Sequence, residues 1–526
     1  MTTQPNILFI MADQLRADYL ACNGHPHIRT PNIDALAAKG VNFANAYCQA
    51  PVCGPSRMSF YTGRYAASHG ASYNNVPLRV DERTLGDYLR PQGYRTALVG
   101  KTHMRRDVEG MARLGLDPDS SLGVLISECG FEPFERDDGL HPDQSANPDL
   151  RYNQYLRSKG YNSQNPWHDY ANSAEDESGD PLSGWYMRNS HLPARVREED
   201  SETAYTTNRA MDFIQEASGT PWCLHLSYIK PHWPYMAPAP YHNMYGKEDI
   251  VPAIRSDKER RDTHPVLNAF MQHSESIEFS KEEVRERVIP TYMGMITQLD
   301  DHIGRLVGFL EERGELENTV IVLTSDHGDY LGDHWLGEKE LFHEPSAKIP
   351  MIIFDPRSQA EATRGTRFDN LVEAIDLVPT FIDVAGGNSQ MLDYRLEGRS
   401  LQPLVHNEKP SQWRNYAFSE SDYAWRPARQ ALNLSVEQAK AYMITDGHWK
   451  YIHYEHQRPQ LFDLKTDPGE LNDLVPGNNH ADVCSKLEKA LAEWCFSRKL
   501  RVTMSNQLIE ANTGMAHKRG YLFGVW

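Results

Sequence analysis

Four apolar runs of the chain are followed by side chains that can bind protons, anions or metal ions. The runs and the polar residues after them are 6–11 with Asp13 and Gln14, 96–99 with Lys101 and His103, 222–228 with His232, and 319–325 with Asp326 and His327. Oxygen ligands with one imidazole suit Ca²⁺ or Mn²⁺ best, with Mg²⁺ and Zn²⁺ as alternatives. We therefore predict a divalent metal at Asp13, Asp326 and His327, with Gln14 as a neutral oxygen donor, beside an anion site.

Each of these residues also has a structural explanation. Asp13 could cap a helix, Lys101 and Lys339 could be solvated surface charges, and His232 could belong to a Pro-His-Trp-Pro turn. Asp326 is harder to explain in this way, because a charge directly after a buried strand needs a partner or a metal. Taken together, these residues favour a metal site beside an anion site.

The segment Cys53-Gly54-Pro55-Ser56-Arg57 offers a nucleophile. Pro55 favours the first turn of a helix, which would place Cys53 at its positive N-terminal end. A reactive thiolate is one interpretation, and a buried structural cysteine is the other. The seven cysteines contain no C-x-x-C pair, which argues against a zinc cage or a disulfide framework.

Apolar strands alternating with helices must position these residues. We expect strands at 6–11, 96–99, 222–228, 319–325 and 350–354, and helices at 30–40, 84–90 and 290–313. This pattern predicts an α/β fold with a mainly parallel sheet sandwiched by helices. Ligands of such sheets bind beyond the carboxyl ends of the strands.

The predicted domain organisation has three parts. Residues 1–414 form the catalytic α/β domain, in which the aperiodic segment 105–206 is an insertion that shapes the pocket or else an inert solvated excursion. Residues 415–500 form a smaller α+β domain with antiparallel strands at 442–444, 449–453 and 460–463 and a helix at 481–496. The tail 501–526 ends in an apolar stretch from Tyr521 to Trp526. We expect this stretch to pack on its own body or on a neighbouring subunit, which suggests a homo-oligomer.

Composition excludes several partners. The net charge of −18 would repel a phosphate backbone, so nucleic acid is not expected. No apolar run reaches the roughly 18 residues of a membrane span. The first apolar stretch, 7–12, has neither a basic leader nor a cleavage site, so we expect a cytoplasmic protein without a membrane partner.

Several motifs resemble those of the sulfatase family, in the alkaline phosphatase superfamily. Cys53-Gly54-Pro55-Ser56-Arg57 with Thr62-Gly63-Arg64 resembles the signature C-x-P-S-R…TGR, in which the cysteine becomes formylglycine. The other similar motifs are Asn6-Ile7-Leu8…Asp13-Gln14, Thr30-Pro31-Asn32-Ile33-Asp34, Gly100-Lys101-Thr102-His103, Ser325-Asp326-His327-Gly328…Leu331-Gly332-Asp333-His334, and Gln460-Leu461-Phe462-Asp463-Leu464…Asp467-Pro468-Gly469. They run in the family's order from about residue 5 to residue 475.

The resemblance implies an alkaline-phosphatase-like fold and a role for each matching position. A formylglycine-generating enzyme would convert Cys53, and the hydrated aldehyde, activated by the metal, would be the nucleophile. Arg57 would hold the diol, and Lys101 and Lys339 would clamp the anion. His232 would protonate the leaving group, and His103 would accept the proton released when the aldehyde re-forms.

Two departures concern substrate choice. Gln14 and His327, where many sulfatases have Asp and Asn, resemble the phosphonate monoester hydrolase and choline sulfatase branches, as does the segment that includes Asn74, a candidate contact to the substrate anion. Lys101 and His103 instead match the sulfatases. We therefore rank hydrolysis of a small sulfate ester, of arylsulfatase type, above a phosphonate monoester hydrolase or phosphodiesterase activity. An anion-binding module with unmodified Cys53 and a two-metal phosphatase rank lower.

Overall fold

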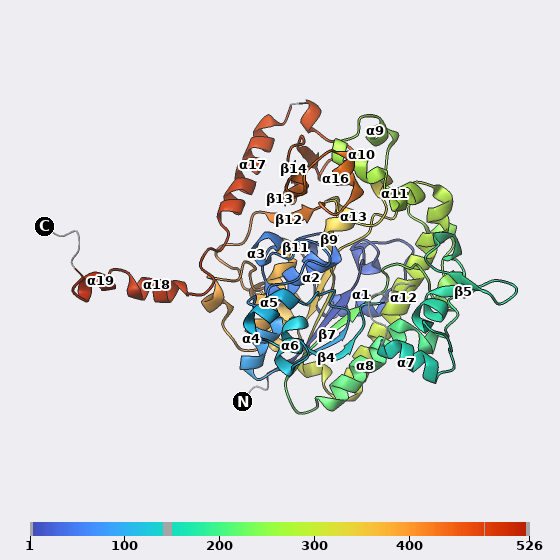
Figure 1. Cartoon of the computed structure of the whole chain (residues 1–526), viewed down its shortest axis with the longest axis horizontal. Helices are drawn as coiled ribbons and strands as arrows, with labels where there is room; N and C mark the ends of the chain where they lie inside the picture. Colours follow the sequence, from blue (N-terminus) through green and yellow to red (C-terminus); the bar gives the residue numbers. More distant parts are fainter. Residues whose placement is uncertain (1–3, 140–149, 478, 522–526) are drawn as a thin grey trace.

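A central sheet with helices on both faces forms the body of the protein (Figure 1). The computed structural model describes residues 4–139, 150–477 and 479–521. In this part of the chain the sheet has nine strands in the order β11-β2-β10-β8-β1-β7-β3-β4, with β9 paired to β2. Their bounds are β1 Asn6–Ala12, β2 Val41–Tyr47, β3 Arg95–Gly100, β4 Glu132–Arg136, β7 Trp222–Tyr228, β8 Thr319–Ser325, β9 Lys348–Ile349, β10 Met351–Phe354 and β11 Thr366–Glu373.

The sheet is mainly parallel, which confirms the predicted fold class. Strands β8, β1, β7, β3 and β4 run parallel to one another, and β10 runs antiparallel to both of its neighbours. Every residue of β1, β7 and β8 is buried. These strands are apolar almost throughout because helices cover both faces of a parallel sheet.

Two helical layers enclose the sheet (Figure 1). Helices α1 (Pro31–Lys39), α8 (Glu202–Glu216) and α12 (Glu282–Glu312) bury apolar side chains against one face of the strands. Helices α2 (Cys53–Thr62), α4 (Leu85–Leu89) and α14 (Leu377–Val384) pack on the other face. Alternate residues of β1 point to opposite layers, as the pleat requires: Leu8 and Ile10 contact one cluster, and Ile7 and Phe9 the other.

Helix α12 begins earlier than its sequence pattern predicts. The expected start was residue 290, but the helix begins at Glu282 and continues through Pro290. Glu282 and Glu283 in the first turn favour this start, since acidic side chains stabilise the positive end of a helix. Proline removes one backbone hydrogen bond, and the burial of Val288 and Ile289 just before it offsets the loss.

A smaller antiparallel sheet follows the central one. It has the order β12-β13-β14-β15, with β12 Ala417–Asp422, β13 Lys440–Thr445, β14 Trp449–Tyr454 and β15 Gln460–Asp463, and α17 (Ala481–Phe496) packs against it. Helix α17 has the predicted bounds, and the three predicted strands are confirmed. The sequence analysis missed β12, whose residues Ser419, Glu420 and Ser421 are polar although buried.

Segment 105–206 contains more regular structure than its sequence predicts. Its described elements include α5 (Val108–Leu114), α6 (Ser121–Ser127), β4 and α7 (Arg151–Ser158). These elements are too short to show a sustained periodicity. Strand β4 pairs with β3 at the edge of the central sheet, so part of this segment belongs to the body of the domain.

The C-terminal arm, residues 497–521, extends away from the body (Figure 1). It carries α18 (Asn506–Asn512) and α19 (Met515–Lys518), and Leu500 is 88% exposed. The expected packing of the apolar end falls largely on residues 522–526, which lie outside the described residues. None of the helices described in the structure is long and apolar enough to cross a membrane.

Candidate active site

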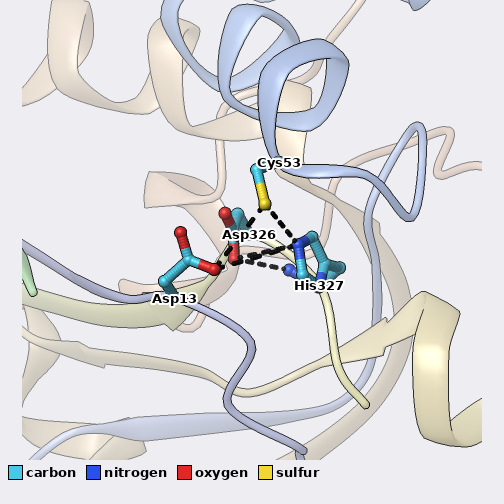
Figure 2. Close-up of side chains that lie close together, drawn as sticks. All are labelled: Asp13, Cys53, Asp326 and His327. Atoms are coloured by element: carbon cyan, nitrogen blue, oxygen red, sulfur yellow. Dashed lines mark hydrogen bonds and ion pairs between the residues drawn. The ribbon is translucent and has the colours of Figure 1, made fainter. Parts of the chain in front are cut away.

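Neighbouring strands bring the predicted site residues to one edge of the sheet. Strands β8, β1, β7 and β3 are adjacent and parallel, so their carboxyl ends lie side by side. Asp326 follows β8, Asp13 follows β1, His232 follows β7 by a short turn, and Lys101 follows β3. The side chains of Asp13, Cys53, Asp326 and His327 point toward one another (Figure 2).

Cys53 lies at the centre of this group. It is the first residue of α2 and is buried, and its place at the helix start agrees with the prediction from Pro55. Its Sγ lies 3.1 Å from His327 Nε2, 3.7 Å from Asp13 Oδ1 and 3.3 Å from Lys339 Nζ. Burial raises the pKa of the Cys53 thiol, but the charges of Lys339, Lys101 and His327 outweigh it and hold that pKa well below its usual value.

The cluster of Asp13, Cys53, Asp326 and His327 fits a divalent metal ion. One ligand atom of each residue lies within 4.8 Å of all the others. Mn²⁺ and related ions bind carboxylate and imidazole ligands such as these, and the carboxylate oxygens also suit Ca²⁺. Within the described chain this is the one cluster of its kind, which gives no support to a two-metal site.

Arg57 orients both carboxylates of the cluster. Its Nε donates to Asp326 Oδ2 at 2.8 Å and its Nη2 to Asp13 Oδ2 at 3.0 Å. The second oxygens of the two carboxylates have other neighbours. Asp13 Oδ1 lies 3.7 Å from Cys53 Sγ, and Asp326 Oδ1 lies 3.7 Å from His327 Nε2. The remaining guanidinium hydrogen bonds go to Lys101 O and Ser227 Oγ. The expected contact of Arg57 with the nucleophile stays a prediction.

The two lysines make the site cationic within an acidic protein. Lys101 Nζ lies 2.6 Å from Asp13 Oδ2, and Lys339 Nζ lies 2.8 Å from Gln14 Oε1. With Arg57 they give three cations against two carboxylates, all at least nine-tenths buried. Burial and the Cys53 charge raise the pKa of Asp13, but Lys101, His232 and Arg57 hold it well below the usual range. Such a site attracts an anion locally although the whole chain is negative.

The two predicted proton-transfer histidines also border Cys53. His232 Nδ1 donates to Trp233 O at 2.7 Å, and its Nε2 lies 3.3 Å from Lys339 Nζ. Burial lowers the pKa of His232 to about 4, against the opposing charge of Asp13. His103 has a left-handed backbone (φ 54°), fixed by a hydrogen bond from its N–H to Asp138 Oδ1 at 3.0 Å. Its side chain lies near enough to Cys53 to help lower the pKa of that thiol.

Aromatic residues border the site on the side of Asn74. Asn74 Oδ1 accepts from the Gly54 N–H at 2.7 Å, which fixes its amide beside the nucleophile. The adjacent Tyr73 donates to Glu340 Oε1 at 2.7 Å. Its ring stacks on Trp425, with centroids 6.2 Å apart and an interplanar angle of 11°. Trp425 comes from the loop after β12 and is 66% exposed.

The sequence analysis assigned no role to two residues that the structure places behind the site. Asp329 and Tyr235 are buried, and Tyr235 donates to Asp329 Oδ2 at 2.7 Å. Asp329 also accepts from Gln14 Nε2 at 2.5 Å. The signal was present, because Asp329 is the second carboxylate after β8, but its partners come from distant segments that the sequence does not bring together.

Comparisons with known proteins agree with this architecture. The family model described as Sulfatase matches residues 5–387, and one described as N-sulphoglucosamine sulphohydrolase, C-terminal, matches residues 332–496. The multifunctional alkaline phosphatase superfamily protein PehA of Trinickia caryophylli is 31% identical over 94% of this chain and 96% of its own. An arylsulfatase of Clostridium perfringens is 28% identical over 96% of this chain and 98% of its own.

A solved structure shares the whole fold. The phosphonate monoester hydrolase from Silicibacter pomeroyi superimposes with a TM-score of 0.83 at 28% identity, covering 95% of this chain and 96% of that one. The fold, the site and these matches define a hydrolase of the alkaline phosphatase superfamily. Within it, the chain belongs to the sulfatase family.

Proposed function

We propose that the protein hydrolyses small sulfate esters of the arylsulfatase type, with formylglycine formed from Cys53 by a formylglycine-generating enzyme. The observation that carries this proposal is the arrangement around Cys53 Sγ, where His327 Nε2 and Lys339 Nζ lie at 3.1 and 3.3 Å and Asp13 Oδ1 at 3.7 Å. A nucleophile in this position faces a candidate metal site on one side and ammonium groups on the other.

The candidate metal ligands support the nucleophile. Asp13, Asp326, His327 and residue 53 would hold one divalent ion, Ca²⁺ or Mn²⁺ by preference, with Gln14 as a further oxygen donor. Such an ion would lower the pKa of the nucleophile and offset charge on the ester. The hydrated aldehyde of formylglycine would supply one oxygen, already deprotonated because of that lowered pKa, to attack sulfur, and it would later expel sulfate as its C=O bond re-forms.

The remaining residues bind the ester and move protons. Lys101 and Lys339 would hold the sulfuryl oxygens as charge develops on them, and Asn74 would add a contact to the anion. As the new S–O bond forms and the ester S–O bond breaks, the protonated form of His232, which a bound anion favours by raising its pKa, would give a proton from Nε2 to the leaving oxygen while Trp233 O holds its Nδ1 proton. His103 would then take the proton of the second hydroxyl of the diol, and sulfate would leave.

A phosphonate monoester hydrolase or phosphodiesterase activity with the same nucleophile is the second candidate. It is favoured by Gln14 and His327 at the site and by the likeness to the phosphonate monoester hydrolase from Silicibacter pomeroyi. Sulfate ranks first because Lys101 and Lys339 both border Cys53, and two ammonium groups suit a sulfuryl group whose three oxygens gain charge.

Relative rates on matched esters distinguish the two candidates. We would measure kcat/KM for 4-nitrophenyl sulfate and for 4-nitrophenyl phenylphosphonate, with the Cys53→Ala variant as the blank. The proposal predicts the larger kcat/KM on the sulfate and none in the variant. A large preference for the phosphonate would reverse the order, and full activity in the variant would refute the shared nucleophile.

We also propose that the enzyme works in the cytoplasm. All seven cysteines are unpaired in the structure, which supports a reducing compartment.

A further inference from the structure

Asp329 is a buried carboxylate beside the site to which the mechanism above gives no task. It is fully buried and accepts three hydrogen bonds. Gln14 Nε2 and Tyr235 OH donate to its Oδ2 at 2.5 and 2.7 Å, and the Leu331 N–H donates to its Oδ1 at 3.1 Å. Asp329 therefore acts as an acceptor for groups from the segments after β1 and β7 and from its own loop.

This arrangement fixes which way the Gln14 amide points. An amide has one donating and one accepting end, and Asp329 takes the donating end. Gln14 Oε1 is then directed to Lys339 Nζ at 2.8 Å, and that ammonium lies 3.3 Å from Cys53 Sγ. In the reversed orientation the NH₂ group would face the ammonium, and two donors would meet.

The backbone of Gln14 is held by Asp326, one of the candidate metal ligands. Its N–H donates to Asp326 Oδ1 at 3.0 Å, and its φ of 64° lies in the left-handed region, which non-glycine residues adopt at a cost. Backbone and side chain are thus both fixed. A carboxylate at this position would accept through either oxygen and need no orientation, whereas an amide does.

We propose that Asp329, held by Tyr235, is a positioning residue. It presents the carbonyl oxygen of Gln14 to Lys339 and to the divalent ion that Asp13, Cys53, Asp326 and His327 would hold. Among the described residues, Asp329 forms no hydrogen bond with Lys339 or Cys53. It therefore acts on them through Gln14. The expected effect of Asp329 on metal binding rests on the proposed function, but the orientation of the Gln14 amide does not. Loss of such supporting groups typically weakens metal binding by about 10- to 100-fold.

A double-mutant cycle tests whether Asp329 acts through Gln14. Mn²⁺ affinity would be measured by titration calorimetry for Asp329→Asn, Gln14→Ala and the double variant, each with its melting temperature in the metal-free state. The amide introduced by Asp329→Asn can itself donate, so it competes with the orientation of Gln14. We expect Asp329→Asn to raise the Kd about tenfold or more in the natural background and less than about twofold in the Gln14→Ala background.

Control variants separate positioning from stability. Tyr235→Phe removes one donor to Asp329. It should weaken Mn²⁺ binding too, but less than Asp329→Asn does. Asp300→Asn changes an equally buried carboxylate that accepts from Ile33 N and Asn32; it should lower the melting temperature and leave the Kd unchanged. Equal losses in both Gln14 backgrounds, or a lower melting temperature with unchanged Kd for Asp329→Asn, would overturn the proposal.

A neutron crystal structure of Asp329→Asn, in which the amide deuterons of Gln14 are visible, shows the orientation of the amide without metal or turnover. The proposal predicts that Gln14 Oε1 no longer faces Lys339 Nζ, and an unchanged contact would overturn it. If the natural protein bound no Mn²⁺ and hydrolysed no ester while the amide turned as predicted, the proposed function alone would fail.

Discussion

Arg57 and Asp326 form a fully buried ion pair, with Arg57 Nε 2.8 Å from Asp326 Oδ2 and neither side chain exposed. The same guanidinium reaches Asp13 Oδ2 at 3.0 Å. One residue of the nucleophile helix α2 thereby fixes carboxylates that follow two different strands. The sulfatase signature around Cys53 thus has a structural role in addition to supplying the nucleophile.

Replacing Arg57 by lysine tests that role. A lysine keeps the charge but cannot reach both carboxylates, because it lacks the planar fork of the guanidinium. We expect a lower melting temperature and a loss of about a hundredfold or more in kcat/KM, since small displacements of catalytic groups have such effects. The measurements are calorimetry and steady-state kinetics.

Arg414→Lys is the matched control for this substitution. Arg414 also pairs with two buried carboxylates, Glu373 and Asp376, but it has no contact with Cys53 among the described residues. Its variant should lose stability and keep kcat/KM within about twofold. A similar fall in kcat/KM for both variants would show that Arg57 acts through stability alone.

His225 should make the protein less stable in mild acid. It is fully buried, with Nδ1 at 3.2 Å from Phe9 O and Nε2 at 2.8 Å from Tyr61 OH. Burial and the charge of Arg57 lower its pKa to about 3, whereas an unfolded histidine titrates near about 6.5. The unfolded state therefore binds the proton first as the pH falls, and the contribution of His225 to stability is lost between about pH 6.5 and 3.

His225→Gln, which keeps a donor and an acceptor, should reduce this pH dependence. Between pH 7.5 and 5.5 the free energy of unfolding should fall by about 1.4 kcal/mol less in the variant than in the natural protein. Denaturant titration at the two pH values measures the difference. Parallel losses in both proteins would contradict a neutral, buried His225.

The stacked pair of Tyr73 and Trp425 should favour esters with an aromatic leaving group. The pair adjoins Asn74, which is hydrogen-bonded to Gly54 beside the nucleophile, and aromatic stacking contributes about 0.5–1.5 kcal/mol. Trp425→Ala should therefore lower kcat/KM about threefold to tenfold on an aryl sulfate and leave an alkyl sulfate unaffected. Equal effects on both esters would contradict this, and Phe496→Ala, at another exposed aromatic residue, is the control.

The C-terminal arm should mediate self-association. Its residues 504–521 carry exposed apolar side chains, among them Leu508 and Tyr521, together with Lys518 and Arg519, whereas the whole chain is acidic. A second copy of this acidic chain carries a net charge opposite to that of the basic arm. Removing residues 504–526 should lower the mass measured by light scattering, and an unchanged mass would refute an oligomer built on this arm.

The extent to which the site could be predicted depends on how local its determinants are. Strands β7 and β8 have the predicted bounds because their continuous apolar residues need no tertiary information, and Pro55 was enough to place Cys53 at a helix start. Strand β12 was missed because its buried polar residues find their partners in other elements, such as Glu420 with the Ala67 N–H. Asp329, Tyr235 and Trp425 were assigned no role for the same reason: their contacts join segments far apart in the chain.

The most direct test of the central claim is the mass of the tryptic peptide 40–57, from protein produced with a formylglycine-generating enzyme. This peptide contains Cys53 and also Cys48, so that alkylation and fragmentation compare the two positions within one molecule. The account predicts an aldehyde at residue 53 and an alkylated thiol at residue 48. Alkylated thiols at both positions, in protein that still hydrolyses the sulfate ester, would contradict it.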